Sequence, residues 1–315
     1  MERALNLEHI AAALGEAPLL PTPEELRQKL ADTEFELLLY DGDVADDLVS
    51  VAWYLHSVGS ATEAADLYAP DRQRRAHQVA AHIFDLATQS SRFTYHDKLE
   101  MTFAGQVSYL RGELTPNASA LYRRLSIVTS PLGRHPGTAS LEVGVALLAF
   151  DPQAVYALTD SFRHRYEQLR EDLQVNDLME TPYGAAERVI LGSRALMTFL
   201  TSGDWDRLDR AIELFWEAVD ARASSGDLDS RWVASHLLDI ADGLRRSSPW
   251  ALLPPDLPRK VAHLLTRGTP PVLTLWPPQV DLLSQEANPL NPEIKRLILS
   301  LPTSAGKTLL AGFVI

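Results

Sequence analysis

The spacing of apolar residues over the first 250 positions predicts α-helices rather than β-strands, because these residues recur every three or four positions. The clearest example lies between residues 204 and 220, where an apolar stripe faces away from a charged face. The stripe consists of Leu208, Ala211, Ile212, Phe215, Trp216 and Val219. The charged face consists of Asp209, Arg210, Glu213, Glu217 and Asp220. We therefore expect a helix here that begins at Asp204 as its N-cap and packs through the stripe.

The same criterion predicts helices along the whole of this region. We expect them at about 23–40, 44–58, 71–89, 95–111, 117–129, 139–150, 153–171 and 183–201, with a last one from Asp229 to about residue 244. Thr22 and Glu25 have the spacing of a capping box. Trp205, Trp216 and Trp232 fall within the periodic pattern, and we expect them in the core. The sequence therefore predicts a mainly α, irregular multi-helix domain; a solenoid of helix pairs is the alternative, although no repeat of about 34 residues is found.

Charge and proline content both change near residue 250. The chain carries a formal charge of −13, but residues 251–315 hold six Lys or Arg and four Asp or Glu, so they carry +2 and residues 1–250 carry −15. Ten of the twenty prolines fall between Pro249 and Pro292. An acidic body of this kind repels polyanions, which argues against residues 1–250 as the main nucleic-acid-binding surface. We expect a protein partner for this acidic region instead.

Composition excludes several classes of protein. The chain has no cysteine, which excludes a disulfide scaffold, a thiolate metal site and a cysteine nucleophile. Its first residues lack the basic and apolar pattern of a signal peptide. The apolar run from Leu141 to Phe150 is about half as long as the roughly twenty residues that span a bilayer. We therefore expect a cytoplasmic protein without a membrane partner.

The last residues carry a pattern typical of a phosphate-binding loop. An apolar strand is predicted over 295–301 and a helix over 309–315, and the loop between them contains small residues that let the main chain curl around an anion. The residues predicted to bind the ATP phosphates are Pro302, Thr303, Ser304, Ala305, Gly306, Lys307 and Thr308. Lys307 would reach the β- and γ-phosphates, and the Thr308 hydroxyl would bind Mg²⁺ with the nucleotide.

This segment resembles motif I of superfamily-2 DExH/DEAD-box helicases, particularly the group that includes the helicase domain of DNA polymerase theta. Leu301 stands where a phosphate loop usually has its first glycine, and Gly312 stands where the group often has an acidic residue. The sequence Leu275-Trp276-Pro277-Pro278-Gln279 is similar to the aromatic-Pro-x-Gln element that precedes motif I in these enzymes. The resemblance implies that Gln279 reads the adenine edge of ATP. A long helical region before such a motor also resembles the large helicases of bacterial antiphage defence, such as the helicase subunit of Hachiman.

These observations predict three parts. They are an acidic, all-helical accessory domain over 1–247, a proline-rich connector with the Gln279 element over 248–292, and the first strand, phosphate loop and start of a helix of a RecA-like α/β ATPase domain over 293–315. The resemblance implies ATP and Mg²⁺ as cofactors and DNA or RNA as the track. The carboxylates and second-domain arginines that such enzymes need for hydrolysis are missing, so we expect the N-terminal piece of a longer helicase, inactive as an ATPase alone. A helical interaction module and a different P-loop NTPase with a helical sensor are the alternatives.

Other candidate residues have simpler explanations in the sequence. The arginines that might be taken for phosphate contacts fit charged helix faces that balance the acidic region. They are Arg72, Arg74, Arg75, Arg123, Arg124, Arg245 and Arg246. The acidic residues at 41, 43, 46 and 47 lack the spacing of a calcium loop and fit a helix N-terminus. His77 and His82 are not spaced as metal ligands on one helix face. We expect Trp250 to fasten the connector to the motor.

Overall fold

The structure is a computed structural model, which describes residues 7–15, 21–39, 42–60, 70–125, 135–221, 227–253 and 277–285, with residues 263, 266, 272, 274, 275, 289–291 and 293. Every regular element in these ranges is a helix, which confirms the prediction of a mainly α protein. No helix among them combines the length and the apolar character needed to cross a membrane. The predicted strand over 295–301 and the segment that follows it lie outside the described residues.

The chain divides into two compact units. Unit 1 comprises Met1–Arg134 and Gly144–Ala149, and unit 2 comprises His135–Val143 and Phe150–Ile315. The helices of unit 1 are α1 (Leu7–Leu14), α2 (Pro23–Leu39), α3 (Asp46–Ser60), α4 (Pro70–Ala87), α5 (Tyr95–Arg111) and α6 (Thr115–Arg124), and the boundary falls within α7 (Pro136–Leu148). The helices of unit 2 are α8 (Pro152–Leu173), α9 (Gly184–Ser202), α10 (Trp205–Asp220), α11 (Leu228–Ser247), α12 (Pro249–Leu252) and α14 (Pro277–Leu283). The predicted accessory domain, 1–247, therefore spans both units.

Side chains just before several helices hold their first turns. Thr22 and Glu25 form the predicted capping box of α2, since the Thr22 amide donates to Glu25 Oε2 (2.8 Å) and the Glu25 amide donates to Thr22 Oγ1 (3.3 Å). Asp204 caps α10 as predicted and accepts a hydrogen bond from the amide of Asp206 (3.2 Å). The cap of α11 is Asp227, two residues before the predicted start at Asp229. The ends of these helices are thus set largely by local side chains.

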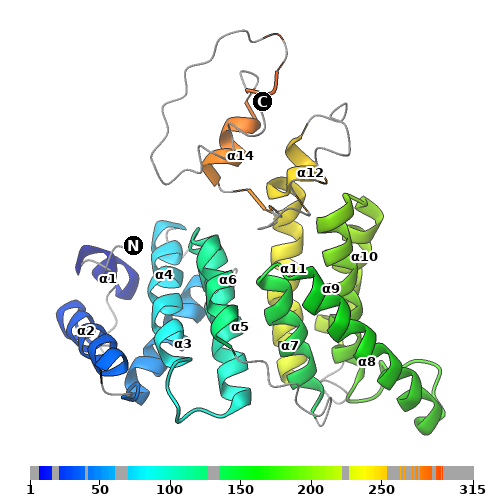
Figure 1. Ribbon diagram of the computed structural model, residues 1–315, viewed down its shortest axis with the longest axis horizontal. Helices are drawn as coiled ribbons and strands as arrows, with labels where there is room; N and C mark the ends of the chain where they lie inside the picture. Colours follow the sequence, from blue (N-terminus) through cyan, green and yellow to red (C-terminus); the bar gives the residue numbers. More distant parts are fainter. Residues whose placement is uncertain are drawn as a thin grey trace. The chain divides into compact units, whose positions relative to one another are not determined.

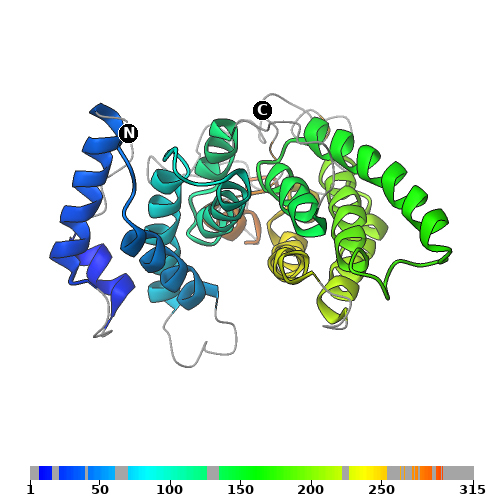
Figure 2. The same cartoon turned by 90° about the horizontal axis from the view of Figure 1, so that it is seen from below.

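The core of unit 1 is built around α4 and α5, which pack against each other and against α3 and α6 (Figure 1, Figure 2). Nearly every side chain of α5 between Leu99 and Tyr109 is buried, so this helix has no solvent-facing stripe. The buried Gln106 amide donates to the carbonyl groups of Ala118 (3.2 Å) and Val145 (3.0 Å), both within unit 1. Hydrogen bonds of this kind offset the cost of burying a polar group in the core.

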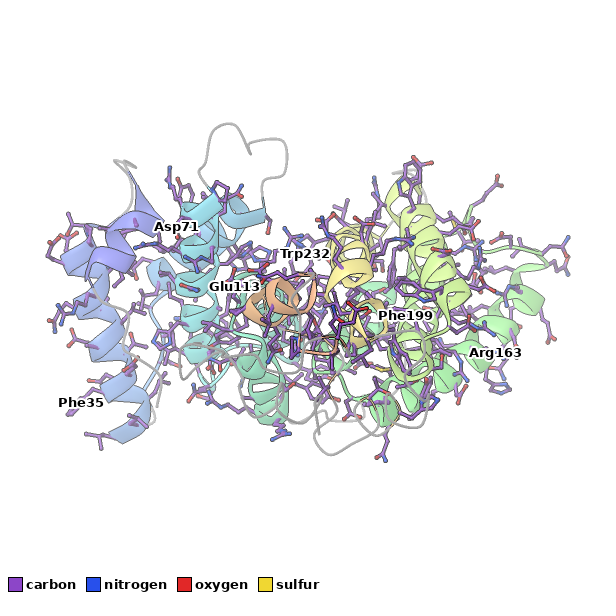
Figure 3. The ribbon with its side chains drawn as sticks, turned by 90° about the horizontal axis from the view of Figure 1, so that it is seen from above. Phe35, Asp71, Glu113, Arg163, Phe199 and Trp232 are labelled. Atoms are coloured by element: carbon purple, nitrogen blue, oxygen red, sulfur yellow. The ribbon has the colours of Figure 1, made fainter. Side chains whose placement is uncertain are left out.

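In unit 2, the central helix is α9, which packs against α8, α10 and α11. Phe199 of α9 is fully buried among these helices, whereas Phe35 of α2, in unit 1, projects outward (Figure 3). A Cβ atom at Gly192 would lie 2.6 Å from Cε1 of Phe215, so the glycine permits α9 and α10 to approach closely. A second cluster packs α7 and α8 on α9 through Val143, Phe162 and Ile190.

The prediction that all three tryptophans lie in the core is wrong for two of them. Trp205 is 39% exposed and Trp216 is 58% exposed, while Trp232 is partly buried. The reason lies in the orientation of α10. Its buried residues are Leu208, Ala211, Leu214, Phe215 and Ala218, so the helix is rotated toward Leu214 relative to the predicted stripe. Trp216 therefore lies on the outer edge of the stripe, beside the charged face.

Candidate functional site

The connector that leads toward the predicted phosphate loop is attached to the end of α11. The amide of Leu275 donates to the carbonyl of Ser247 (2.7 Å). Leu275, Leu282 and Leu283 form a buried cluster. Leu252, Leu253, Val272, Val280 and Leu290 pack against it. The described part of the connector is therefore folded onto the helical unit rather than extended as a free tether.

Trp250 fastens the start of this connector to α9, whereas the motor segment to which we expected it to bind lies outside the described residues. Its indole Nε1 donates to the carbonyl of Leu200 in α9 (2.9 Å). The ring also lies so close to Gly203 that a Cβ atom there would be 2.4 Å from Cε3 of the indole. Gly203 has a φ of 73°, a left-handed conformation that ends α9 and that favours glycine. Trp276, the other tryptophan of the connector, lies outside the described residues.

Gln279, the candidate adenine reader, lies in α14 and is 1% exposed. Its neighbours in the chain, Leu282 and Leu283, belong to the buried cluster of the connector. A buried amide requires hydrogen-bond partners, and Gln279 interacts with other residues of the protein. The structure thus places Gln279 in the interior of the connector. The residues predicted to bind phosphate, from Pro302 to Thr308, lie outside the described residues.

A polar cluster that the sequence did not reveal lies in the core of unit 1. His56 of α3 and His77 of α4 each place Nδ1 near the Ser108 hydroxyl of α5, at 2.9 and 3.2 Å. Burial lowers the pKa of His56 to about 4, and burial together with the neighbouring His56 lowers the pKa of His77 to about 3. Both rings are therefore neutral at pH 7. Ser108 is fully buried, so this serine and its histidines form a structural network and not an accessible nucleophile.

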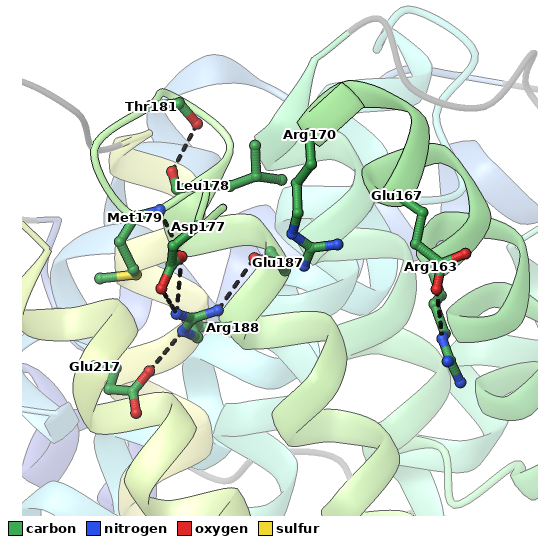
Figure 4. A network of polar contacts seen from close by, with 10 residues as sticks. All are labelled: Arg163, Glu167, Arg170, Asp177, Leu178, Met179, Thr181, Glu187, Arg188 and Glu217. Atoms are coloured by element: carbon green, nitrogen blue, oxygen red, sulfur yellow. Dashed lines mark hydrogen bonds and ion pairs between the residues drawn. The ribbon is translucent and has the colours of Figure 1, made fainter. Parts of the chain in front are cut away.

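A second network joins α8, α9 and α10 in unit 2 (Figure 4). Arg188 donates to Glu217 (2.5 Å) and to Glu187 (3.1 Å), and its Nη2 donates to both carboxylate oxygens of Asp177 (3.0 and 2.8 Å). Glu187, whose side chain is only 3% exposed, also pairs with Arg170. Each charged group of this cluster has a partner of opposite charge. The cluster therefore has a structural role, which is to link three helices.

The histidine and two carboxylates at one end of α11 lie close enough together to hold a metal ion. The ligand atoms of His135, Asp227 and Asp229 lie within 4.8 Å of one another. Burial and then the charge of Asp229 raise the pKa of Asp227. Asp227 already accepts a hydrogen bond from the amide of Asp229 (3.1 Å) as the N-cap of α11. Helix capping therefore accounts for one carboxylate oxygen of Asp227, and His135 Nδ1 lies 3.6 Å from the other.

Many of the arginines and acidic residues named in the sequence analysis form ion pairs or hydrogen bonds within the protein, which gives them structural roles. Arg74 and Arg75 pair with Asp71 (2.6 and 2.8 Å), and Arg245 pairs with Asp209 (2.7 Å). Arg72 donates to the carbonyl of Leu14 (3.0 Å), and Arg124 pairs with Asp85. Asp46 and Asp47 lie in the first turn of α3 as predicted, where they pair with Arg92 and Lys29. His82 pairs with Glu34 (2.7 Å).

The geometry therefore identifies no complete catalytic centre among the described residues, and the nucleotide site remains a prediction from residues 302–308. A scan against protein-family models finds no match for this chain, and a search of curated proteins finds none either.

Proposed function

We propose that this chain is the N-terminal region of a cytoplasmic, ATP-dependent nucleic-acid helicase or translocase. In this proposal, residues 293–315 begin a RecA-like α/β ATPase domain, and the two helical units form its accessory region. The observation that carries the proposal is the strand–loop–helix pattern around Gly306-Lys307-Thr308. The attachment of the connector to α11 supports it, because a motor can transmit force only to a domain to which it is firmly joined.

The proposal gives Lys307 and Thr308 separate tasks. The ammonium of Lys307 would neutralise charge on the β- and γ-phosphates, and the Thr308 hydroxyl would bind the Mg²⁺ that accompanies them. The backbone amides of the loop would hold the remaining phosphate oxygens. ATP and Mg²⁺ would supply the driving force for movement along DNA or RNA. Contact with the nucleic acid would come from motor segments rather than from the acidic helices, which repel polyanions.

Nucleotide binding by the chain itself tests this proposal. Binding of a fluorescent ATP analogue with Mg²⁺ is measured by anisotropy for the wild type, Lys307→Ala and Lys98→Ala. Lys98 is a matched control because it lies on α5 in unit 1, far along the chain from the phosphate loop. We expect binding that Lys307→Ala weakens at least about tenfold and that Lys98→Ala leaves unchanged. Equal binding by all three proteins, or no binding by a folded wild type, would refute the assignment.

A helical interaction module is the second candidate, and the exposed Trp216 favours it. The gene distinguishes the two. An in-frame continuation beyond codon 315 with an Asp-Glu-x-His-like sequence about a hundred residues later supports the helicase, since those carboxylates position Mg²⁺ and the attacking water. On a chain that includes such a motif, nucleic-acid-stimulated ATPase activity that persists in Lys307→Ala would remove Lys307 from the mechanism.

A further inference from the structure

The cluster at the start of α11 contains a buried carboxylate oxygen to which no described residue donates a hydrogen bond. The Asp227 side chain is 8% exposed, and its Oδ1 accepts the capping hydrogen bond from the amide of Asp229 (3.1 Å). Its Oδ2 is buried and has no hydrogen-bond partner among the residues that the structure describes. His135 Nδ1 lies 3.6 Å from this oxygen, which is beyond hydrogen-bonding distance. Since a buried charge is costly unless it is closely paired, this oxygen indicates a position for a cation.

The groups around Asp227 compensate its charge only in part. Burial raises the pKa of Asp227 most, and the negative charge of Asp229 raises it further. The amides of Asp229 and Gly137 and the ring of His135 each lower the pKa by a smaller amount. The pKa remains raised on balance, so the folded protein disfavours the ionised form of this carboxyl group. A bound cation would reverse this balance, because it favours the ionised form.

The three candidate ligands come from two segments that are far apart in the sequence. His135 directly precedes α7, whereas Asp227 and Asp229 lie at the start of α11. The buried hydroxyl groups of Ser140 in α7 and Ser230 in α11 share a hydrogen bond (2.8 Å), which holds the two helix starts together. All five residues belong to unit 2. The ligands are therefore positioned by two helices whose relative placement is fixed close by.

The absence of a side chain at Gly137 gives the two carboxylates room to converge. A Cβ atom there would lie 2.5 Å from Oδ2 of Asp229 and 2.8 Å from Oδ2 of Asp227, so both oxygens border the same small space. One oxygen of each carboxylate and one ring nitrogen of His135 lie within 4.8 Å of one another. Two anions at such a distance repel each other, and a cation between them turns this repulsion into attraction.

The donor set of this cluster favours zinc over magnesium and calcium. Mg²⁺ and Ca²⁺ prefer oxygen ligands, so they would leave the imidazole nitrogen unused. Zn²⁺ binds imidazole nitrogen and carboxylate oxygen together, at about 2.0–2.2 Å. Two ligands of a tetrahedral ion at these distances are about 3.4 Å apart. The separation of His135 Nδ1 from Asp227 Oδ2 is close to this, at 3.6 Å. A divalent ion also neutralises the charges of the two carboxylates.

We propose that His135 Nδ1, Asp227 Oδ2 and one oxygen of Asp229 bind a zinc ion, with water in the fourth position. His135 has 61% of its side chain exposed, so the ion can enter the site from solvent. Bound zinc would join the segment before α7 to the start of α11 and would stabilise unit 2. This inference does not depend on nucleotide binding.

Calorimetric titration of the full, chelator-treated chain with Zn²⁺ tests the proposal. The variants His135→Gln and Asp227→Asn each remove one ligand. Asparagine caps helices about as well as aspartate does, so Asp227→Asn keeps the cap of α11 and removes only the anion. The matched controls are Asp151→Asn, at the cap of α8 in the same unit, and His164→Gln, at an exposed histidine of α8. Circular dichroism verifies folding, and the exposed His135 keeps the test decisive if Asp227→Asn does not fold.

We expect one zinc ion per chain, with a Kd of about 10 μM or lower, and at least about tenfold weaker binding by each ligand variant. Both controls should bind zinc as the wild type does. Zinc should also slow amide hydrogen exchange in the first turns of α7 and α11, which locates the site. Co²⁺ in place of zinc should give the intense visible absorption of a tetrahedral ion.

The proposal is overturned if zinc does not bind at about 100 μM, or if either ligand variant binds it unchanged. It is also overturned if Mg²⁺ in large excess displaces the zinc, because the site would then use oxygen ligands alone. Equal amide exchange with and without zinc in the two helix starts would leave an ion pair between His135 and Asp227 as the role of the cluster, and would overturn the proposal as well.

Discussion

The buried histidine pair of unit 1 makes the stability of that unit depend steeply on pH. His56 and His77 have pKa values of about 4 and about 3, against an ordinary value of 6.5. Between these values, the unfolded chain binds protons that the folded chain does not, so stability is complete above pH 6.5 and falls as the pH decreases. At pH 5, each histidine lowers the free energy of unfolding by about 2 kcal/mol. This pH lies about 1.5 units below the ordinary histidine pKa, and each unit corresponds to about 1.4 kcal/mol. The pair therefore removes about 4 kcal/mol, a large part of the 5–15 kcal/mol that a typical domain has.

Amide hydrogen exchange in peptides of α3, α4 and α5 measures this loss separately from the unfolding of unit 2. It is followed between pH 5 and 7.5, with correction for the intrinsic exchange rate. Some carboxyl groups of unit 1, such as those of Glu25 and Asp71, have lowered pKa values. Their contribution to the stability of the folded unit is lost only below about pH 4.5, which is outside this range. The double variant His56→Gln, His77→Gln should have a nearly flat profile, whereas the control His164→Gln, at an exposed site on α8, should behave as the wild type does.

A decrease of less than about 1 kcal/mol in the wild type between pH 7.5 and 5 would refute this reasoning, because it would mean that the folded state accepts the protons. If the double variant does not fold, the wild type and His164→Gln still decide the question. An equal slope in the double variant would assign the pH dependence to other groups.

Three further substitutions test the packing described above. Gly192→Ala should destabilise unit 2 by about 1–3 kcal/mol, because its Cβ would lie 2.6 Å from the ring of Phe215; an unchanged midpoint in urea would contradict the close contact. Arg188→Met should cost about 3 kcal/mol because it leaves three carboxylates without their shared partner, while Arg163→Met, from an exposed pair, should cost at most about 0.5 kcal/mol. Their thermal midpoints should differ accordingly, and equal midpoints would assign the Arg188 network no special role. Thr22→Ala should cost about 1 kcal/mol, seen as faster amide exchange in the first turn of α2 and nowhere else.

Local features of the fold were predictable because they depend on residues close together in the chain. The capping box of Thr22 and Glu25 and the cap at Asp204 follow from spacings of a few residues. The start of α11 was placed one residue late, at Asp229 instead of Leu228, because Asp227 and Asp229 are both suitable caps. The short helix α1 was not predicted, since its eight residues contain too few turns for a periodic pattern.

Features that depend on contacts between distant residues were not predictable. The inward face of α10 depends on its packing against α9 and α11, and no pattern within α10 shows whether Leu214 or Trp216 faces inward. His56, His77 and Ser108 meet only because three helices pack together, and nothing in their spacing distinguishes them from the other histidines and serines. The phosphate loop is the opposite case, because its pattern is local and its residues lie outside the described part of the chain.

Gly59 near the end of α3 imposes a constraint on how this sequence can vary. A Cβ atom at this position would lie 2.6 Å from Cδ2 and Nε2 of the His77 ring, so the ring occupies the space that any other side chain would need. Glycine is itself unfavourable in a helix, by about 1 kcal/mol relative to alanine. We therefore expect the two positions to change together in evolution. A lineage that replaces His77 with a smaller residue becomes free to replace Gly59 with alanine and to gain helix stability, whereas replacement of Gly59 first is disfavoured.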